Sequence, residues 1–147
     1  MPTVRYGSAG GVVAEGEKVL VVLRPGRLGP EGQPEVRLPK GHREPGESRE
    51  ETARREVGEE AGWWQVEIVA DLGHQIVEFD WQDRHVVRDE SFFVMAPQAG
   101  APISQPEQQF TPTWLTWEEA LAQLTFEAER EWVRRAYHRI QEDPRAP

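Results

Sequence analysis

Residues Gly41–Trp63 read G-H-R-E-P-G-E-S-R-E-E-T-A-R-R-E-V-G-E-E-A-G-W, and the rest of the chain is best understood from them. Ser48, with Glu51 three residues later, matches the capping box that opens many helices. Gly62 stands where a left-handed glycine commonly ends a helix. We therefore predict a helix over Arg49–Ala61, entered from a turn rich in glycine and proline.

The predicted helix has two distinct faces. Small apolar residues at every fourth position would let it lie close on a sheet, and these are Ala53, Val57 and Ala61. Another face gathers three carboxylates at spacings of three and four, namely Glu56, Glu59 and Glu60. Like charges repel at these spacings, and the helix dipole disfavours anions near the C-terminus. A bound divalent cation would make the cluster favourable, and all-oxygen ligands indicate Mg²⁺ or Mn²⁺. The alternative is an acidic amphipathic helix with a solvated face.

The same stretch resembles the Nudix box. The residues at the spacings of that motif are Gly41, Glu47, Arg55-Glu56-Val57, Glu59-Glu60 and Gly62-Trp63. A merely solvated charged face would require neither the glycines nor a glutamate at fixed spacing before the helix. The resemblance implies a metal-dependent hydrolase that splits a diphosphate linked to another moiety, often a nucleoside.

Roles for individual residues follow from this resemblance. It implies that Glu56 and Glu60 are metal ligands, joined by the carbonyl of Gly41. It implies that Glu59 is a further ligand or orients a metal-bound water. It also implies structural support from an ion pair between the side chains of Arg55 and Glu47, which would hold the loop to the helix.

The general base is left open by the sequence. In some relatives a box glutamate serves, and in others a carboxylate from the loop before the last strand. That loop reads Q-P-E-Q-Q here, so Glu107 is its one candidate, because glutamine cannot take a proton at neutral pH. Glu90 lies on a strand that could face the site, but we interpret it as a surface carboxylate.

The turn before the helix narrows the range of candidate substrates. Residues 38–47, L-P-K-G-H-R-E-P-G-E, are similar to the P-K-G-H-x-E-P-G-E segment of Nudix dinucleoside polyphosphate hydrolases. Lys40 could then contact a phosphate, and His42 could donate a hydrogen bond or a proton to a leaving group. Further candidates for phosphate contacts are Arg24, Arg27, Arg37 and Arg43. Those relatives usually carry a tryptophan where this chain has Val36, so the stacking aromatic is either missing here or supplied elsewhere, with Trp81 and Phe79 as candidates.

Two other kinds of function compete with this hypothesis. Within the same chemistry, the substrate could be a modified nucleoside triphosphate, a nucleoside diphosphate sugar or a diphosphoinositol phosphate. In a different class, the chain could be a catalytically silent Nudix-fold binding module. Silent modules typically lose box carboxylates, and this chain keeps all of them.

Length and composition limit the number of domains, the kinds of partner and the cellular location that we expect. A chain of 147 residues fits a single domain, 1–147, with a sizeable core. The net charge of −9 argues against a nucleic acid polymer as partner, although a small phosphorylated molecule remains compatible with it. No apolar run is long enough to span a membrane. The absence of cysteine suits a cytoplasmic protein. The oligomeric state, monomer or homodimer, is open.

The order of predicted elements indicates an α/β protein with a mixed sheet between helices, and the Nudix resemblance implies an α/β/α sandwich. The other two predicted helices cover Trp117–Leu124, capped by Thr116 with Glu119, and Phe126–Gln141. The predicted strands are Thr3–Ala14, Val19–Leu23, Val36–Lys40, Trp64–Leu72, Gln75–Trp81, Val86–Ala96 and Thr113–Thr116. We expect loops over Arg24–Glu35, a candidate lid, and Pro97–Pro112, and a frayed tail over Asp143–Pro147.

Overall fold

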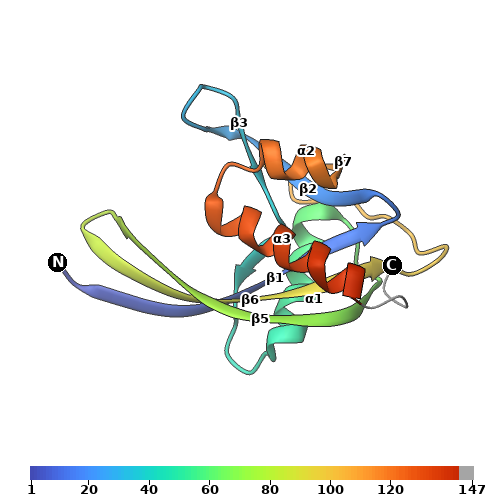
Figure 1. Ribbon diagram of the computed structural model, residues 1–147. Coiled ribbons are helices and arrows are strands. Elements are labelled where there is room, and N and C mark those ends of the chain that lie inside the picture. Colours follow the sequence, from blue (N-terminus) through green and yellow to red (C-terminus); the bar gives the residue numbers. More distant parts are fainter. Residues whose placement is uncertain (143–147) are drawn as a thin grey trace.

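A mixed seven-stranded sheet with helices on both faces runs through the computed structural model, which describes residues 1–142 (Figure 1). The elements in chain order are β1 (Thr3–Glu15), β2 (Lys18–Leu28), β3 (Pro34–Arg37), β4 (Lys40–His42), α1 (Arg49–Ala61), β5 (Val66–Trp81), β6 (Arg84–Pro97), β7 (Thr111–Thr116), α2 (Trp117–Gln123) and α3 (Glu127–Glu142). The main strand order is β3-β2-β1-β6-β5, while β4 pairs with β1 and β7 pairs with β2.

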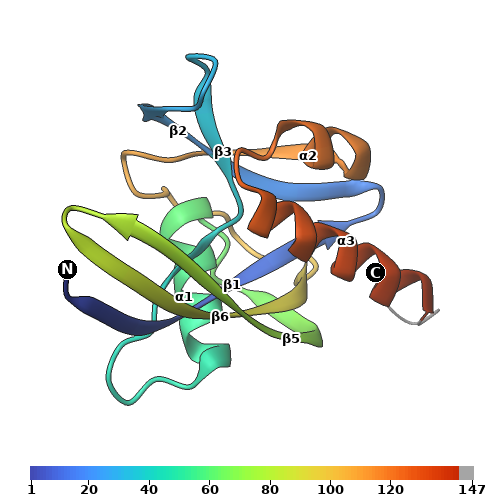
Figure 2. The same ribbon diagram turned by 60° about the vertical axis from the view of Figure 1, so that its left-hand side comes forward.

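Strand β1 is the centre of this arrangement. It runs parallel to β6, with Thr3 opposite His85 and Val13 opposite Met95. It runs antiparallel to β2 and to the short β4, whose Gly41 lies opposite Ala9. Helix α1 covers one face of the sheet, and α2 and α3 cover the other (Figure 2). The α/β class and the sandwich predicted from the sequence are confirmed.

Helix α1 has the predicted bounds. The Ser48 side chain accepts a hydrogen bond from the Glu51 backbone N–H, and the Glu51 carboxylate accepts one from the Ser48 N–H. At the other end Gly62 has a φ of 80°, and its N–H donates to the Gly58 carbonyl. The small apolar stripe packs on the sheet with no exposed surface at Ala53, Val57 or Ala61. Local sequence therefore fixed both the ends of this helix and the face that it buries.

Three sequence predictions about the strands were wrong. The single strand expected over Val36–Lys40 is two short strands, β3 paired with β2 and β4 paired with β1. The expected loop over Arg24–Glu35 is shorter, because β2 continues through Leu28 and pairs with β3, with an irregular register between Arg24 and Leu28. The two strands predicted over Trp64–Leu72 and Gln75–Trp81 are one strand, β5, with irregularities that keep it paired to β6. In β2 and in β5, pairing with a neighbouring strand overrode the local turn signals.

The C-terminal elements agree closely with prediction. The Thr116 and Glu119 capping box opens α2, and Trp132 and Ala136 of α3 are fully buried against the sheet. The predicted tail after α3 lies outside the described residues. Within residues 1–142, no helix has the length and hydropathy needed to cross a membrane.

Candidate active site

The short strand β4 lies against the carboxylates of α1. A Cβ at Gly41 would overlap the carboxylate of Glu56, so only glycine permits this contact. One carboxylate oxygen of Glu60 accepts a hydrogen bond from the backbone N–H of Lys40 at 3.1 Å. The predicted cluster is therefore assembled by two elements, with the helix supplying the acids and β4 supplying backbone that approaches them closely.

Burial changes the ionisation of these acids. It raises the pKa of Glu60 to about 8, and the nearby charge of Glu56 adds to the shift. Burial also raises the pKa of Glu56, which is 8% exposed. The charges of Glu59 and Glu107 act in the same direction on Glu56. Keeping several carboxylates ionised here requires positive charge inside the cluster.

Arg55 supplies one such charge. Its Nε donates to Glu47 at 2.7 Å and one terminal nitrogen donates to the same carboxylate at 3.0 Å. The other terminal nitrogen donates to Glu56 at 2.7 Å and to Glu59 at 3.1 Å. A further bond of 2.9 Å reaches the carbonyl of His42. The expected ion pair with Glu47 is thus present, and this guanidinium bond holds the pKa of Glu47 down at about 2. A single guanidinium joins the turn, the helix and β4.

The oxygen atoms around Gly41, Glu56 and Glu60 can be compared with the ligands that a divalent cation needs. Within residues 1–142, no three acidic or histidine side chains converge on one point as a complete ligand set would. Two observations nevertheless fit a cation: the raised pKa values of buried Glu56 and partly buried Glu60, and the backbone approach at Gly41 that a side chain would block. Oxygen donors of this kind suit Mg²⁺ or Mn²⁺.

The loop between β6 and β7 brings Glu107 to the same end of α1. The Glu107 N–H donates to the Glu59 carbonyl at 2.8 Å, and the Ser104 N–H donates to the Gly62 carbonyl at 2.8 Å. The Glu107 side chain is exposed. The fold therefore brings together Glu107 and Glu59, the two kinds of general-base candidate that the sequence left open.

Glu90 corrects a sequence interpretation. It is fully buried rather than on the surface, and its carboxylate accepts a hydrogen bond from Trp132 Nε1 at 2.7 Å and pairs with Arg88 at 2.9 Å. Its position on β6, an interior strand that α3 covers, explains the burial. Its partners come from strand and helix, so Glu90 belongs to the packing between the sheet and α3.

Lys40 lies in the same buried layer. It is 6% exposed, and burial lowers its pKa although the charges of Glu129 and Glu90 act in the opposite direction. Glu129 of α3 also accepts a hydrogen bond from the Leu38 N–H at 2.6 Å. Lys40 and His42 are two residues apart on a strand, but His42 is exposed where Lys40 is covered. The phosphate contact predicted for Lys40 stays a prediction, and its ammonium group is shielded from solvent.

The candidate arginines separate into two places. Arg24 lies with its guanidinium carbon 5.3 Å from the centre of the Phe110 ring. Burial lowers its pKa, and the charges of Arg27 and Arg37 lower it further, while Glu60 opposes them. These three arginines thus form a positive group, of which Arg24 and Arg37 interact electrostatically with Glu60. Arg43 lies elsewhere, in the turn, where its Nε donates to the Glu47 carbonyl at 2.6 Å.

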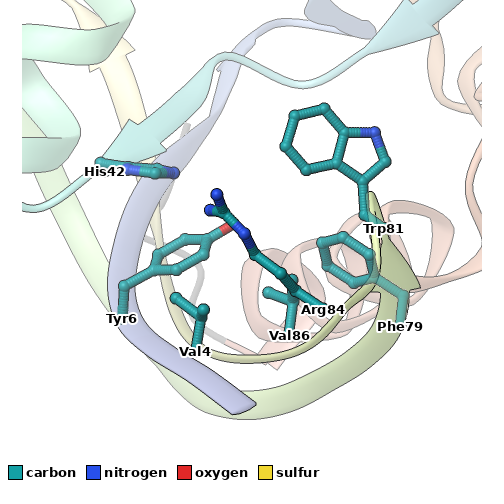
Figure 3. Close-up of a pocket in the computed structure, with 7 residues that line it drawn as sticks. All are labelled: Val4, Tyr6, His42, Phe79, Trp81, Arg84 and Val86. Carbon is teal, nitrogen blue, oxygen red and sulfur yellow. The ribbon is translucent and has the colours of Figure 1, made fainter. Parts of the chain in front are cut away.

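A small aromatic cavity lies on the other side of β4. Its volume is about 160 Å³, and Figure 3 shows the side chains that line it: Val4, Tyr6, His42, Phe79, Trp81, Arg84 and Val86. The sequence had singled out Phe79 and Trp81 as aromatic candidates but missed Tyr6 and Arg84. The parallel pairing of β1 with β6 brings these residues together, and no local motif signals that pairing.

Comparison with known proteins gives a family match over most of the chain. The model described as "NUDIX domain" matches residues 5–136. "Putative mutator protein MutT4" of Mycobacterium tuberculosis is 32% identical over 134 residues, which are 88% of this chain and 54% of that protein. The chain therefore spans about half the length of this curated relative.

Solved structures share the fold. A NUDIX hydrolase from Nitrosomonas europaea has a TM-score of 0.70 at 21% identity, covering 95% of this chain and 90% of the other. An Ap4A hydrolase of C. elegans, solved as a binary complex, has a TM-score of 0.64 at 19% identity, covering 94% and 99%. At these identities the likeness establishes the architecture and leaves the substrate open.

Proposed function

Because the chain belongs to the NUDIX family, we propose that it is a pyrophosphohydrolase that cleaves a phosphoanhydride bond in a nucleoside-linked substrate, with a dinucleoside polyphosphate as the leading candidate. The observation that carries the chemistry is the pair of carboxylates on α1 that meet the β4 backbone, buried Glu56 beside Gly41 and partly buried Glu60 at the Lys40 N–H. All the box carboxylates are kept, which supports an enzyme rather than a silent binding module.

The divalent cation typical of the family would be held by Glu56, Glu60 and the Gly41 carbonyl, with Glu59 as a further ligand or as the group that orients water. When bound, Mg²⁺ or Mn²⁺ would neutralise phosphate charge and lower the pKa of a coordinated water. Arg55 holds the acids against the turn through Glu47. Glu59 or Glu107 would take the proton from the attacking water.

The substrate assignment rests on the surroundings of β4. Exposed His42 can donate to a phosphate oxygen, and burial together with the charges of Lys40 and Arg88 lowers its pKa. Lys40 would add positive potential beneath the substrate. Arg24 and Arg27 would contact phosphates on the Glu60 side of the site, and Arg43 would contact phosphates near the turn before α1. Cations on both sides of the carboxylates suit a long, highly charged phosphate chain.

A modified nucleoside triphosphate is the second candidate. Its specific support is the 32% identity to a protein whose name describes a mutator protein of the MutT type. A monomeric triphosphate would need one nucleoside site and a shorter run of cations than a dinucleoside polyphosphate. Nucleoside diphosphate sugars and diphosphoinositol phosphates are further alternatives within the same chemistry.

A substrate panel tests the proposal. The purified chain, with Mg²⁺, is assayed on diadenosine tetra- and hexaphosphate, an oxidised purine triphosphate, a nucleoside diphosphate sugar and a diphosphoinositol phosphate. We expect the highest kcat/KM on a diadenosine polyphosphate, with a mononucleotide among the products. Preference for the oxidised triphosphate would move the assignment to the second candidate, and no hydrolysis of any compound would overturn the activity. A cytoplasmic location stays a prediction.

A further inference from the structure

The loop between β6 and β7 completes the carboxyl end of α1. The last carbonyls of an α-helix have no hydrogen-bond partner within the helix. Here the Glu59 carbonyl accepts a hydrogen bond from the Glu107 N–H at 2.8 Å. The Gly62 carbonyl, just past the helix, accepts one from the Ser104 N–H, also at 2.8 Å. The backbone of the loop is therefore docked on the end of α1 at two points.

Gly62 lies between the helix and the docked loop. It is buried, and its φ of 80° is in the left-handed region that glycine adopts without strain. A Cβ at Gly62 would overlap the carbonyl oxygen of Ser104. That oxygen belongs to the backbone, so it cannot rotate away as the end of a flexible side chain could. The docking of the loop therefore requires that residue 62 has no side chain.

The docked loop holds Glu107 near the acids of α1. Burial raises the pKa of Glu56, and the charge of Glu107 adds to this shift, so the two carboxyl groups lie within electrostatic range of each other. Beyond Glu107, the Phe110 N–H donates to the Glu107 carbonyl at 3.0 Å, and the Phe110 side chain is buried in the core. The exposed Glu107 side chain is thus held between one anchor at Gly62 and another at Phe110.

We propose that Gly62 is a positioning residue for Glu107: it leaves room for the Ser104 carbonyl and so docks the loop where Glu107 can take the proton from the attacking water. This inference rests on the proposed function and gives Gly62 a role beyond ending the helix. The water oxygen forms its bond to phosphorus as its proton passes to the Glu107 carboxylate. The phosphoanhydride P–O bond breaks, and its electron pair goes to the leaving phosphate.

Steady-state kinetics of Gly62→Asn on the best panel substrate test the proposal. Asparagine tolerates the left-handed backbone, so the helix end is kept while the new Cβ still meets the Ser104 carbonyl. We expect kcat to fall about tenfold or more, because a displaced general base loses much of its contribution. KM should stay within about threefold of the wild type, since Glu107 has no part in binding the phosphates.

Gly100→Asn is the matched control. Gly100 lies in the same loop and has a φ of 71°, but a Cβ there would meet no atom within 4 Å. This variant therefore introduces the same residue at the same kind of backbone position without the overlap. Its kcat and KM should equal those of the wild type.

A double variant distinguishes positioning of Glu107 from a general loosening of the fold. If Gly62 acts through Glu107, the loss in Gly62→Asn should disappear once Glu107 is replaced. The variant with both Gly62→Asn and Glu107→Gln should then have a kcat within about twofold of that of Glu107→Gln alone. Two losses that multiply would mean that the residues act independently, and this would overturn the proposal. Turnover like that of the wild type in Glu107→Gln would also overturn it.

Hydrogen–deuterium exchange measures the docking without requiring turnover. The amides of Ser104 and Glu107 donate to α1, so residues 104–107 should exchange about tenfold or more faster in Gly62→Asn and at the wild-type rate in Gly100→Asn. Unchanged exchange or unchanged kcat in Gly62→Asn would overturn the proposal. If exchange changes as expected but the wild type hydrolyses no compound of the substrate panel, the docking by Gly62 stands and the proposed activity fails.

Discussion

Two groups of charged residues lie on opposite sides of β4, and both contain buried acids. On the α1 side, Glu56 and Glu60 crowd together with raised pKa values, and Arg55 at their margin is the cation in contact with Glu56. On the α3 side, Glu129 and Glu90 meet the positive charges of Lys40 and Arg88 and donors from the backbone and from Trp132. We call these the α1 cluster and the α3 cluster.

The two clusters differ in how far their own charges neutralise one another. The α3 cluster is mixed in sign, so burial is offset by internal partners and the result is a fixed contact between sheet and helix. The α1 cluster gathers like charges, so it gains most from a cation that comes from outside. Charge balance, rather than burial, therefore separates a structural polar cluster from a candidate catalytic one.

Glu60→Gln should give the largest effect. Gln retains an oxygen to accept the Lys40 N–H but removes the negative charge, so we expect kcat to fall by about 10²–10³-fold on the best panel substrate. Stability should change little, because a pKa of about 8 leaves this carboxyl mostly protonated at neutral pH when no cation is bound. Steady-state kinetics and urea denaturation measure the two quantities. Turnover near that of the wild type would remove Glu60 from the site.

Glu129→Ala should produce the reverse pattern in the α3 cluster. This substitution leaves the buried N–H of Leu38 without its hydrogen-bond acceptor and the Lys40 ammonium without its main opposing charge. We therefore expect the free energy of unfolding to fall by about 3 kcal/mol. Glu118→Ala, an exposed acid in the first turn of α2, is the control and should cost less than about 0.5 kcal/mol. A loss no larger than the control would mean that the α3 cluster contributes little.

Glu47→Gln should have the smallest effect, and a pH-dependent one. The pKa of Glu47 is about 2 in the folded chain against its ordinary value of 4.5, so the unfolded state binds more protons between these values. Its stabilisation is thus present above pH 4.5 and lost as the pH falls toward 2. We expect the variant to be about 1–2 kcal/mol less stable at pH 7, the effect being moderated by solvent near the pair.

Urea denaturation at a series of pH values between 2.5 and 7 follows this loss. The difference between the wild type and Glu47→Gln should shrink toward the acid end of the series. A difference that stays constant with pH would show that Glu47 stabilises the turn by its shape and neutral hydrogen bonds rather than by its charge on Arg55.

The sequence predicted the α1 cluster well because its signals are local. The bounds of α1, its capping box, the stripe ending at Ala61 and the spacing of its three acids all follow from helical periodicity. The contact between Glu47 and Arg55 also lies within one short stretch of chain. The role of the α1 cluster in catalysis stays a prediction.

The α3 cluster and the aromatic cavity could not be predicted from the sequence. Glu90 was misinterpreted as a surface acid because its burial depends on α3, more than 30 residues further along the chain. Tyr6 and Arg84 meet only because β1 pairs in parallel with β6. By itself the sequence determined the helix of acids and the family, because capping, periodicity and spacing act over a few residues. Only the tertiary structure decided which charges are buried together and which aromatic rings face each other, because those contacts depend on strand pairing and on the packing of layers.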